Sequence, residues 1–394
     1  MPEKFNFDEV IDRTGSASYQ WDCRQEFYGD NGVFPMWVAD MHFKSPQVVL
    51  DALRQRIDYG NLAYTAMMPS FYKAITNWMQ TQFNWQIMED WVSFSPGIVT
   101  ALCVAIRAYT QPGDGVLIQT PVYSPFFKTV ERNNRQVIVN QLLLKEGYYT
   151  MDFGKLEQQL PKVKLAILCS PHNPVGRVWT TGELHRFGML CKKHGVIVLS
   201  DEIHADLVYD PYQQISFANA GNNFADFSAT MIAPSKTFNI AGLYTSAIII
   251  PCPELKKRFD TEMDKSYLVE GNLFGIFALE AAYTKGKRWI EALLEYLREN
   301  RDIMLNTINN LPGMRAIVPE GTFIMWVDCR EMGLSDDELM KFFIEKARIG
   351  PAPGTIFGKG GSGFVRLNFA YPRAMLAEVL QQLKNAVDEL IPVR

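Results

Sequence analysis

The sequence lacks the cysteine patterns that bind metals or build disulfide frameworks. Its six cysteines are far apart along 394 residues, and none belongs to a C-x-x-C motif. Zinc sites and small disulfide-stapled folds both need characteristic cysteine spacing, so neither is expected here. We expect a protein without a metal site that works in a reducing compartment.

Long apolar runs and basic clusters are missing as well. No uninterrupted apolar stretch approaches the roughly 18 residues of a membrane span, and residues 1–13 lack the apolar core of a signal peptide. The 39 basic and 43 acidic residues are scattered, and the formal net charge is −4. Nucleic-acid binding usually leaves a concentrated basic footprint. We therefore expect a cytoplasmic protein that binds small molecules, and neither membranes nor nucleic acid.

Strand and helix patterns alternate in the middle of the chain. From about residue 92 to 250, short apolar runs are separated by segments with helical periodicity. Such alternation is typical of a mostly parallel sheet with helices on its faces. The clearest predicted strands lie within residues 114–121, 164–171, 195–202 and 228–235.

The pattern changes near residue 285, and 394 residues exceed what a single core usually holds. Beyond that point a long helical segment is followed by strand, helix, strand and helix. We therefore predict an α/β protein with three parts, which are an N-terminal arm (1–44), a large domain (45–285) and a small α+β domain (286–394).

Two helices carry explicit start and stop signals. The segment SPQVVLDALRQRIDYG predicts a helix with Ser45 as N-cap, Pro46 in the first position and Gly60 just beyond the end. Between two predicted strands, Thr180 and Glu183 have the spacing of a capping box. We therefore predict that the second helix is a crossover connection between parallel strands.

Several polar and aromatic residues stand just beyond predicted strands. Ligands of open parallel sheets bind outside the carboxyl ends of the strands, where the connecting loops converge. We therefore expect one crevice to be faced by Tyr123, Asn173, Asp201, His204 and Lys236.

Two of these residues suggest a specific cofactor chemistry. Asp201 follows the apolar run GVIVLS, and a buried carboxylate there would need a cationic partner such as a protonated pyridine nitrogen. Alternatively, it caps a helix. Lys236 follows another apolar strand, where partial burial would lower its pKa and make it a nucleophile and base. Alternatively, it is an ordinary surface lysine.

Further residues would suit a phosphate and a flat ring. The segment SPGIVT opens an apolar helix, so the N–H groups of Gly97, Ile98 and Val99 could bind an anion, and Ser235 could add a hydroxyl. Alternatively, this is a plain helix start. Tyr123 sits beside prolines and could stack on a ring, or simply pack in the core. Together with Lys236 and Asp201, these groups match pyridoxal phosphate.

The segment from Gly358 into FVRLNFA contains one misleading signal and one useful one. GKGGSG has G-x-G-x-x-G spacing, but it leads into a strand instead of a helix, so we expect no dinucleotide site. Arg366 lies on that strand, and its guanidinium would suit the carboxylate of an amino acid. A surface ion pair is the alternative for Arg366.

Four segments, in order, resemble a known family: SPHNPVGRVW, VLSDEIHADLVY, APSKTFNIAG and GFVRLNFA. They are similar to the pyridoxal-phosphate aminotransferase-like superfamily of fold type I, and more narrowly to the MalY/PatB branch of cystathionine β-lyases and cystalysin-like carbon–sulfur lyases. The resemblance extends from WVADMHF near the start to the last predicted domain. It implies a central sheet of the seven-stranded type and a homodimer with shared active sites.

The resemblance implies a role for each candidate residue. Catalysis would fall to Lys236, which also bonds covalently to the cofactor, and to Tyr123. The implied cofactor-binding residues are Gly97, Ile98, Val99, Tyr123, Asn173, Asp201, His204, Ser235, Lys236 and, from the neighbouring subunit, Tyr64. The implied substrate-binding residues are Arg366, Asn173 and Ala39.

Four positions depart from the patterns of related sequences, and one of them, His42, departs from the pattern of the lyase branch itself. Tyr244 stands where many aminotransferases have a phosphate-binding arginine, and His204 where they often have a tyrosine; both fit the lyase branch. His42 replaces the usual aspartate of ADMDF, and Ala233 replaces a second phosphate-binding serine.

The implied activity is α,β-elimination from cystathionine or related cysteine S-conjugates, which yields a thiol, pyruvate and ammonia. An aminotransferase is the first alternative. The second is a regulatory protein of the same fold that acts through a protein partner.

Overall fold

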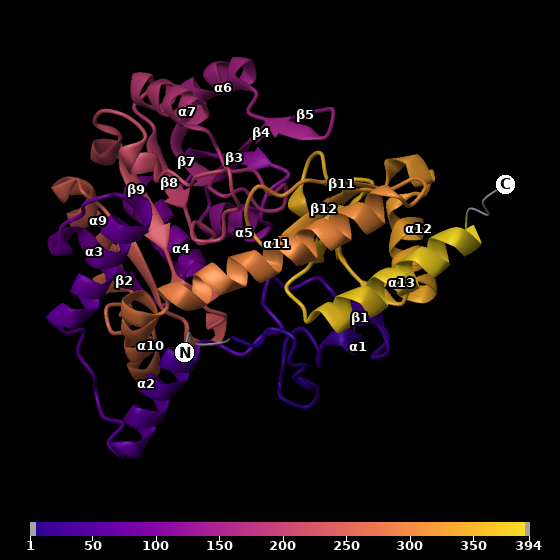
Figure 1. The fold of residues 1–394 in the computed structure, drawn as a ribbon. Coiled ribbons are helices and arrows are strands. Elements are labelled where there is room, and N and C mark those ends of the chain that lie inside the picture. The colour runs from indigo at the N-terminus through magenta and orange to yellow at the C-terminus, as the bar shows by residue number, and fades with distance from the viewer. Residues whose placement is uncertain (1–4, 391–394) are drawn as a thin grey trace.

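A seven-stranded sheet forms the centre of the computed structural model, which describes residues 5–390 (Figure 1). Residues 1–4 of the predicted arm and 391–394 of the predicted small domain lie outside the described part. The strand order is β2-β10-β9-β8-β7-β3-β4, and β10 alone runs antiparallel to its neighbours. The strands are β2 (Val92–Ser95), β3 (Gly115–Thr120), β4 (Gln136–Gln141), β7 (Val163–Cys169), β8 (Ile197–Asp201), β9 (Ser228–Ile232) and β10 (Ser246–Ile249).

The mostly parallel sheet confirms the α/β prediction, and the predicted strands correspond to β3, β7, β8 and β9. Every residue of β3 and of β9 is buried, as expected for a sheet with both faces covered. One face packs on α4 (Ile98–Tyr109), α5 (Pro125–Arg132) and α9 (Pro253–Lys265). The other packs on α6 (Phe153–Gln159) and α7 (Thr181–Lys193).

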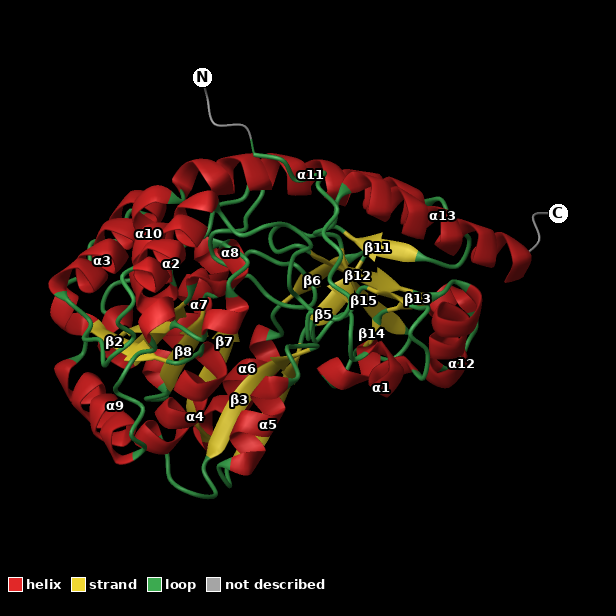
Figure 2. Cartoon of the chain, turned by 90° about the horizontal axis from the view of Figure 1, so that it is seen from below, coloured by secondary structure: helices red, strands yellow, loops and turns green. Residues whose placement is uncertain are grey.

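A second, four-stranded antiparallel sheet lies beside the first (Figure 2). Its order is β11 (Arg315–Ile317), β12 (Ile324–Asp328), β15 (Phe364–Asn368) and β14 (Ala352–Pro353). Two long helices, α11 (Lys287–Asn309) and α13 (Arg373–Leu390), pack against it. The N-terminal arm joins this region, because β1 (Phe34–Pro35) pairs in parallel with β13 (Ile349–Gly350).

The remaining elements are short or lie at the edges. Three helices pack together at one end of the molecule, namely α2 (Gln47–Asp58), α3 (Pro69–Phe83) and α10 (Leu273–Lys285). The others are α1 (Arg24–Tyr28), α8 (Pro234–Thr237), α12 (Asp336–Lys341) and the hairpin of β5 (Leu143–Lys145) and β6 (Tyr148–Thr150).

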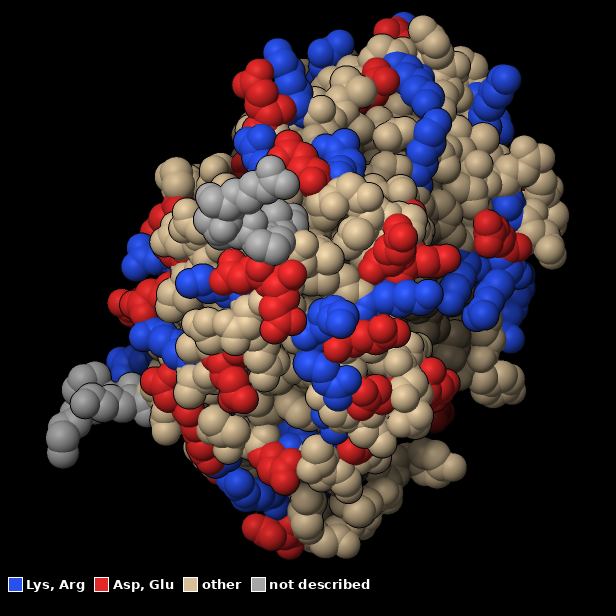
Figure 3. Space-filling view, turned by 90° about the vertical axis from the view of Figure 1, so that its right-hand side faces the viewer, with Lys and Arg blue, Asp and Glu red and all other residues tan. Residues whose placement is uncertain are grey.

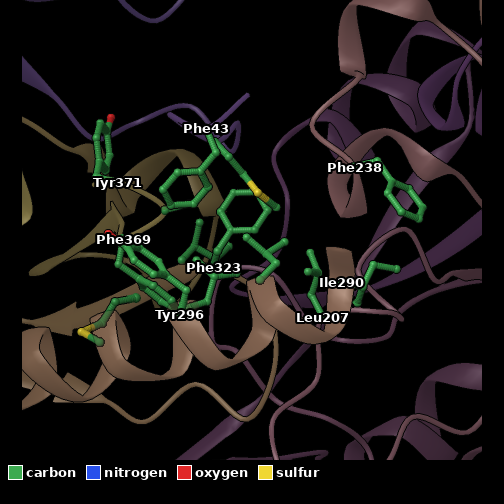
Figure 4. Packing of buried hydrophobic residues seen from close by; sticks show 14 of the residues in the cluster. Phe43, Leu207, Phe238, Ile290, Tyr296, Phe323, Phe369 and Tyr371 are labelled. Atoms are coloured by element: carbon green, nitrogen blue, oxygen red, sulfur yellow. The ribbon is translucent and has the colours of Figure 1, made fainter. Parts of the chain in front are cut away.

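One hydrophobic core crosses the predicted domain boundary at residue 285. Helix α11 begins just beyond it and runs from the helices of the first sheet to the second sheet (Figures 1 and 2). Phe43 of the arm, Phe238 and Phe323 belong to one buried cluster with Ile290 of α11 (Figure 4). Because this core is continuous, the three-part division of the chain stays a prediction.

One of the two predicted helix N-caps is present in the structure and the other is not. The Thr180–Glu183 capping box is present at the start of α7, which confirms that prediction. Ser45 does not cap α2, so that prediction is wrong: the N-cap is Pro46, and the Ser45 hydroxyl donates to the backbone oxygen of Asn239 at 2.9 Å. The reason is a tertiary contact, because the Ser45 hydroxyl bonds to a carbonyl far along the chain and is not available to the first turn of α2. Gly60 follows the end of α2 in a left-handed conformation, with φ of +77°.

The surface mixes charges of both signs. On the face that carries α12 and α13, Lys and Arg side chains alternate with Asp and Glu (Figure 3). Between residues 5 and 390, none of the helices combines the length and apolar character needed to cross a membrane. The six cysteines are free thiols.

Candidate active site

A cavity of about 210 Å³ opens beyond the carboxyl ends of β3, β7, β8 and β9. This is the edge where the sequence places its crevice, because loops that follow parallel strands converge there. Most of the predicted site residues line it, namely Ala39, Gly97, Ile98, Val99, Tyr123, Asn173, Asp201, His204, Ser235 and Lys236.

Lys236 lies on α8, which begins two residues after the end of β9, and it lines the cavity. Its Nζ donates to the backbone oxygen of Ala39 at 2.6 Å. The residue as a whole is half-buried, and desolvation by the surrounding protein lowers the pKa of its amine to about 8. Asp40 opposes that shift, and Arg366 adds to it. Its neutral fraction near neutral pH is therefore far above that of an ordinary surface lysine, which makes this amine a nucleophile and base.

Asp201 ends β8 and is only 4% exposed. Its Oδ1 accepts a hydrogen bond from the N–H of Ile203 at 3.2 Å, and among residues 5–390 it has no salt bridge. Burial raises its pKa to about 7. The segment that follows is a series of turns, so the alternative of a helix N-cap is wrong. The charge of Lys236 in the same cavity offsets this rise in the pKa of Asp201 only in part. A buried carboxylate without an ion-pair partner fits a cationic ring nitrogen.

The first turn of α4 offers backbone donors to the same cavity. Gly97 is the N-cap, with φ of +149°, and no side chain caps this helix. The first N–H groups of a helix have no acceptor within it and carry partial positive charge. Because Ile98, Val99 and the Ser235 hydroxyl also line the cavity, this end of it fits a phosphate group.

Arg366 lies on β15 of the second sheet and reaches Asn173, which follows β7 of the first sheet. It is 6% exposed. Its Nη1 donates to Asn173 Oδ1 at 3.0 Å and its Nη2 to the Trp37 carbonyl, while its Nε is buried without a partner among the described residues. Burial lowers its pKa to about 10, so it stays cationic at neutral pH. The surface ion pair is therefore wrong, and a carboxylate ligand fits.

Tyr123 and His204 also line the cavity, and both side chains are neutral. The N–H of Tyr123 donates to the Asn173 carbonyl at 3.1 Å, and burial raises the pKa of its hydroxyl. His204 is 3% exposed, and its Nδ1 has no partner in the described chain. Burial, followed by the charges of Lys236 and Arg366, lowers the pKa of His204 to about 3. Both side chains are thus uncharged at neutral pH.

The remaining positions singled out in the sequence differ in their relation to the cavity. Tyr64 is fully exposed in the connection between α2 and α3 and does not line the cavity of its own chain. Tyr244 does line it and is 67% exposed. His42 faces away: its Nε2 donates to the Ile11 carbonyl at 2.7 Å, and its ring stacks on Tyr371. The GKGGSG segment leads into the strand β15, as predicted.

The sequence missed several lining residues. They include Cys169, Thr100, Ile203 and Thr245. Cys169 could have been found, since it ends the predicted strand KLAILC, and Thr100 belongs to the first turn after Gly97. Ala233, which replaces the expected serine, also lines the cavity.

Comparisons with known proteins agree along almost the whole chain. A family model described as aminotransferase class I and II matches residues 38–383. Cystathionine β-lyase PatB from Bacillus subtilis is 42% identical over 387 residues, covering 97% of this chain and 100% of PatB. Protein MalY from Escherichia coli is 34% identical over 388 residues, covering 97% of this chain and 99% of MalY.

Solved structures show the same fold. Cystalysin from Treponema denticola, which contains a pyridoxal 5'-phosphate cofactor, is 36% identical with a TM-score of 0.96, covering 99% of this chain and 100% of that one. The PLP-bound C–S lyase from Staphylococcus hominis is 32% identical with a TM-score of 0.91, covering 98% of this chain and 99% of that one. The chain belongs to the class I and II aminotransferase family, in the branch that contains PatB and MalY.

Proposed function

We propose that this protein is a carbon–sulfur β-lyase that uses pyridoxal phosphate and cleaves L-cystathionine or a related cysteine S-conjugate to a thiol, pyruvate and ammonia. One observation carries the proposal: Lys236 and Asp201 share a single cavity with Asn173, which in turn holds Arg366. The names of PatB, cystalysin and the Staphylococcus hominis lyase support the same activity.

Different cavity residues would bind different parts of the cofactor. Lys236 would bond to it covalently, and Asp201 would pair with its ring nitrogen. Tyr123, Asn173 and His204 would contact the ring. The phosphate would be held at the start of α4 by the backbone of Gly97, Ile98 and Val99, together with the hydroxyl of Ser235.

The chain's own residues bind the substrate and move protons. When bound, pyridoxal phosphate supplies an electron sink for the pair left at the α carbon. Arg366 and Asn173 hold the substrate carboxylate, with the backbone of Ala39 alongside. Lys236, as a neutral amine, removes the α proton. The leaving sulfur then receives a proton from Lys236 or from Tyr123, whose hydroxyl keeps its proton at neutral pH because burial raises its pKa.

A single assay separates a lyase from an aminotransferase. With L-cystathionine and no keto acid, we expect continuous pyruvate release over many turnovers, because elimination regenerates the enzyme. An aminotransferase would stop after one turnover. Lactate-dehydrogenase-coupled detection gives the time course, and cystine with aryl and alkyl cysteine conjugates extends the substrate panel. Failure of all of these substrates to give more than one equivalent of pyruvate would contradict the lyase proposal.

We also propose a homodimer in which Tyr64 reaches the cofactor phosphate of the neighbouring subunit. Exposed apolar side chains support this, since they cluster on and around the segment that contains Tyr64: Ile57, Tyr59, Leu62, Tyr64 and Met68. Monomers rarely leave such surfaces uncovered. A cytoplasmic location is likewise proposed, supported by the free cysteines.

The dimer is tested by sedimentation and by cofactor affinity. We expect twice the 44.9 kDa of one chain. We also expect Tyr64→Ala to weaken pyridoxal phosphate binding about tenfold, because a hydrogen bond to a charged group is lost. Tyr212→Ala, at an exposed tyrosine outside this segment, should bind normally. A monomer, or equal affinity in Tyr64→Ala and wild type, would rule out the shared site.

A further inference from the structure

The strap, defined as residues 37–43, borders the cavity through Ala39 and is not part of a helix or strand. Side chains from distant parts of the chain satisfy its backbone. Each of the five consecutive carbonyls from Trp37 to Met41 accepts a hydrogen bond from a side chain. Residues 37–40 are half-buried and residues 41–43 are buried. Carbonyls shielded from water need partners, so the position of the strap depends on these donors.

Two of the donors belong to the proposed chemistry. Lys236 donates to Ala39, and Arg366 donates to Trp37. These contacts join the strap directly to the amine and to the carboxylate-binding guanidinium. They cannot alone hold the strap during turnover, because both side chains must also engage substrate or cofactor.

Asn368 holds the strap from the second sheet. It lies on β15, two residues beyond Arg366, and is 1% exposed. Its Nδ2 donates to the carbonyls of Val38 at 2.8 Å and Asp40 at 2.6 Å, on either side of Ala39. Its Oδ1 accepts from the N–H of Ala370 at 2.8 Å, which fixes the orientation of the amide.

Asn239 holds the other half of the strap from the turn that follows α8. It lies three residues beyond Lys236, with φ of +54°. Its Nδ2 donates to the carbonyls of Met41 at 3.0 Å and Phe43 at 2.8 Å, and its Oδ1 accepts from the N–H of Met41 at 3.0 Å. One amide thus satisfies three backbone groups of the strap.

We propose that Asn239 and Asn368 are positioning residues, which hold the strap so that the carbonyls of Trp37 and Ala39 stay directed at Arg366 and Lys236. Neither amide lines the cavity, and both act through the strap. This inference rests on the proposed function for its kinetic consequence, but its structural part can be tested without substrate or cofactor.

Hydrogen–deuterium exchange of the strap tests the structural part. We expect amide exchange within residues 37–43 to rise about tenfold in Asn368→Ala and in Asn239→Gly, since each loses at least one net hydrogen bond. Glycine tolerates the left-handed backbone at position 239. The matched control is Asn300→Ala, because Asn300 is also buried and donates to two carbonyls, those of Phe369 and Tyr371, outside the strap.

The kinetic part separates positioning from plain loss of stability. We expect KM for L-cystathionine to rise about tenfold in both strap variants, with a smaller change in kcat, and to stay unchanged in the control even if its Tm falls. Unchanged exchange in both strap variants, or an equal increase in Asn300→Ala, would overturn the inference. If wild type releases no pyruvate, the proposed function fails, and the exchange measurements still decide whether the two asparagines hold the strap.

Discussion

Lys236→Ala is expected to lose covalent attachment of pyridoxal phosphate and to lower lyase turnover by about 10³-fold or more. The attachment needs the side-chain amine, and removing a general base alone typically costs about 10²- to 10⁴-fold. Borohydride reduction followed by denaturation and mass spectrometry shows whether the cofactor stays on the chain. Lys193→Ala, at an exposed lysine paired with Glu157, should match wild type in both measurements.

The pH dependence of this attachment follows from the environment of Lys236. The neutral amine is the reactive form, and burial lowers its pKa to about 8. Near pH 7.4 roughly a fifth of the amines would then be neutral, instead of about one in a thousand at the ordinary lysine value. Covalent uptake by the cofactor-free protein should therefore rise with pH and level off above about 8. A rise that continued toward pH 10, or a reducible adduct in Lys236→Ala, would contradict the assignment.

The residues that the sequence located best are those whose position follows from local patterns. Apolar runs predicted β3, β7, β8 and β9, and parallel strands bring their following residues to one edge. Asp201 and Lys236 could therefore be assigned to one crevice although 35 residues separate them in the sequence. The same reasoning located the start of α4 at this crevice, because a glycine before an apolar helix is a local signal.

Features that depend on contacts between distant segments were not predictable in this way. Nothing near Ser45 indicates that its hydroxyl binds the carbonyl of Asn239. The carbonyls of the strap likewise carry no sequence signal, and their donors lie about 200 to 330 residues away. The continuous core around α11 was missed for a related reason, since periodicity shows which face of a helix is buried but not which sheet covers it.

Asp201→Asn is expected to abolish most lyase turnover while stabilising the cofactor-free protein at alkaline pH. In the folded protein burial raises the pKa of Asp201 to about 7, from 3.8. The folded state therefore holds this proton more tightly than the unfolded state, and stability falls as pH rises from about 4 to 7. The upper limit is about 4 kcal/mol at pH 8, from about 1.36 kcal/mol per pKa unit. Asparagine cannot ionise, so this loss disappears.

Glu202→Gln provides the matched control. Glu202 is also buried, its pKa is also raised to about 7 by burial, and its Oε1 accepts all three of its short hydrogen bonds, which a glutamine oxygen can retain. It does not line the cavity. Each variant removes the contribution of one carboxyl to the fall in unfolding free energy between pH 5 and 8. That fall should therefore be smaller than in wild type by at most about 3 kcal/mol in each variant.

The two variants should differ once the cofactor is present. Pyridoxal phosphate should raise the Tm of Glu202→Gln as much as that of wild type, because the carboxylate of Asp201 is still there to pair with the ring nitrogen. It should raise the Tm of Asp201→Asn less, and turnover should be lost in that variant alone. Equal stabilisation of both variants by the cofactor would mean that Asp201 is a buried carboxylate of the fold with no part in holding the ring.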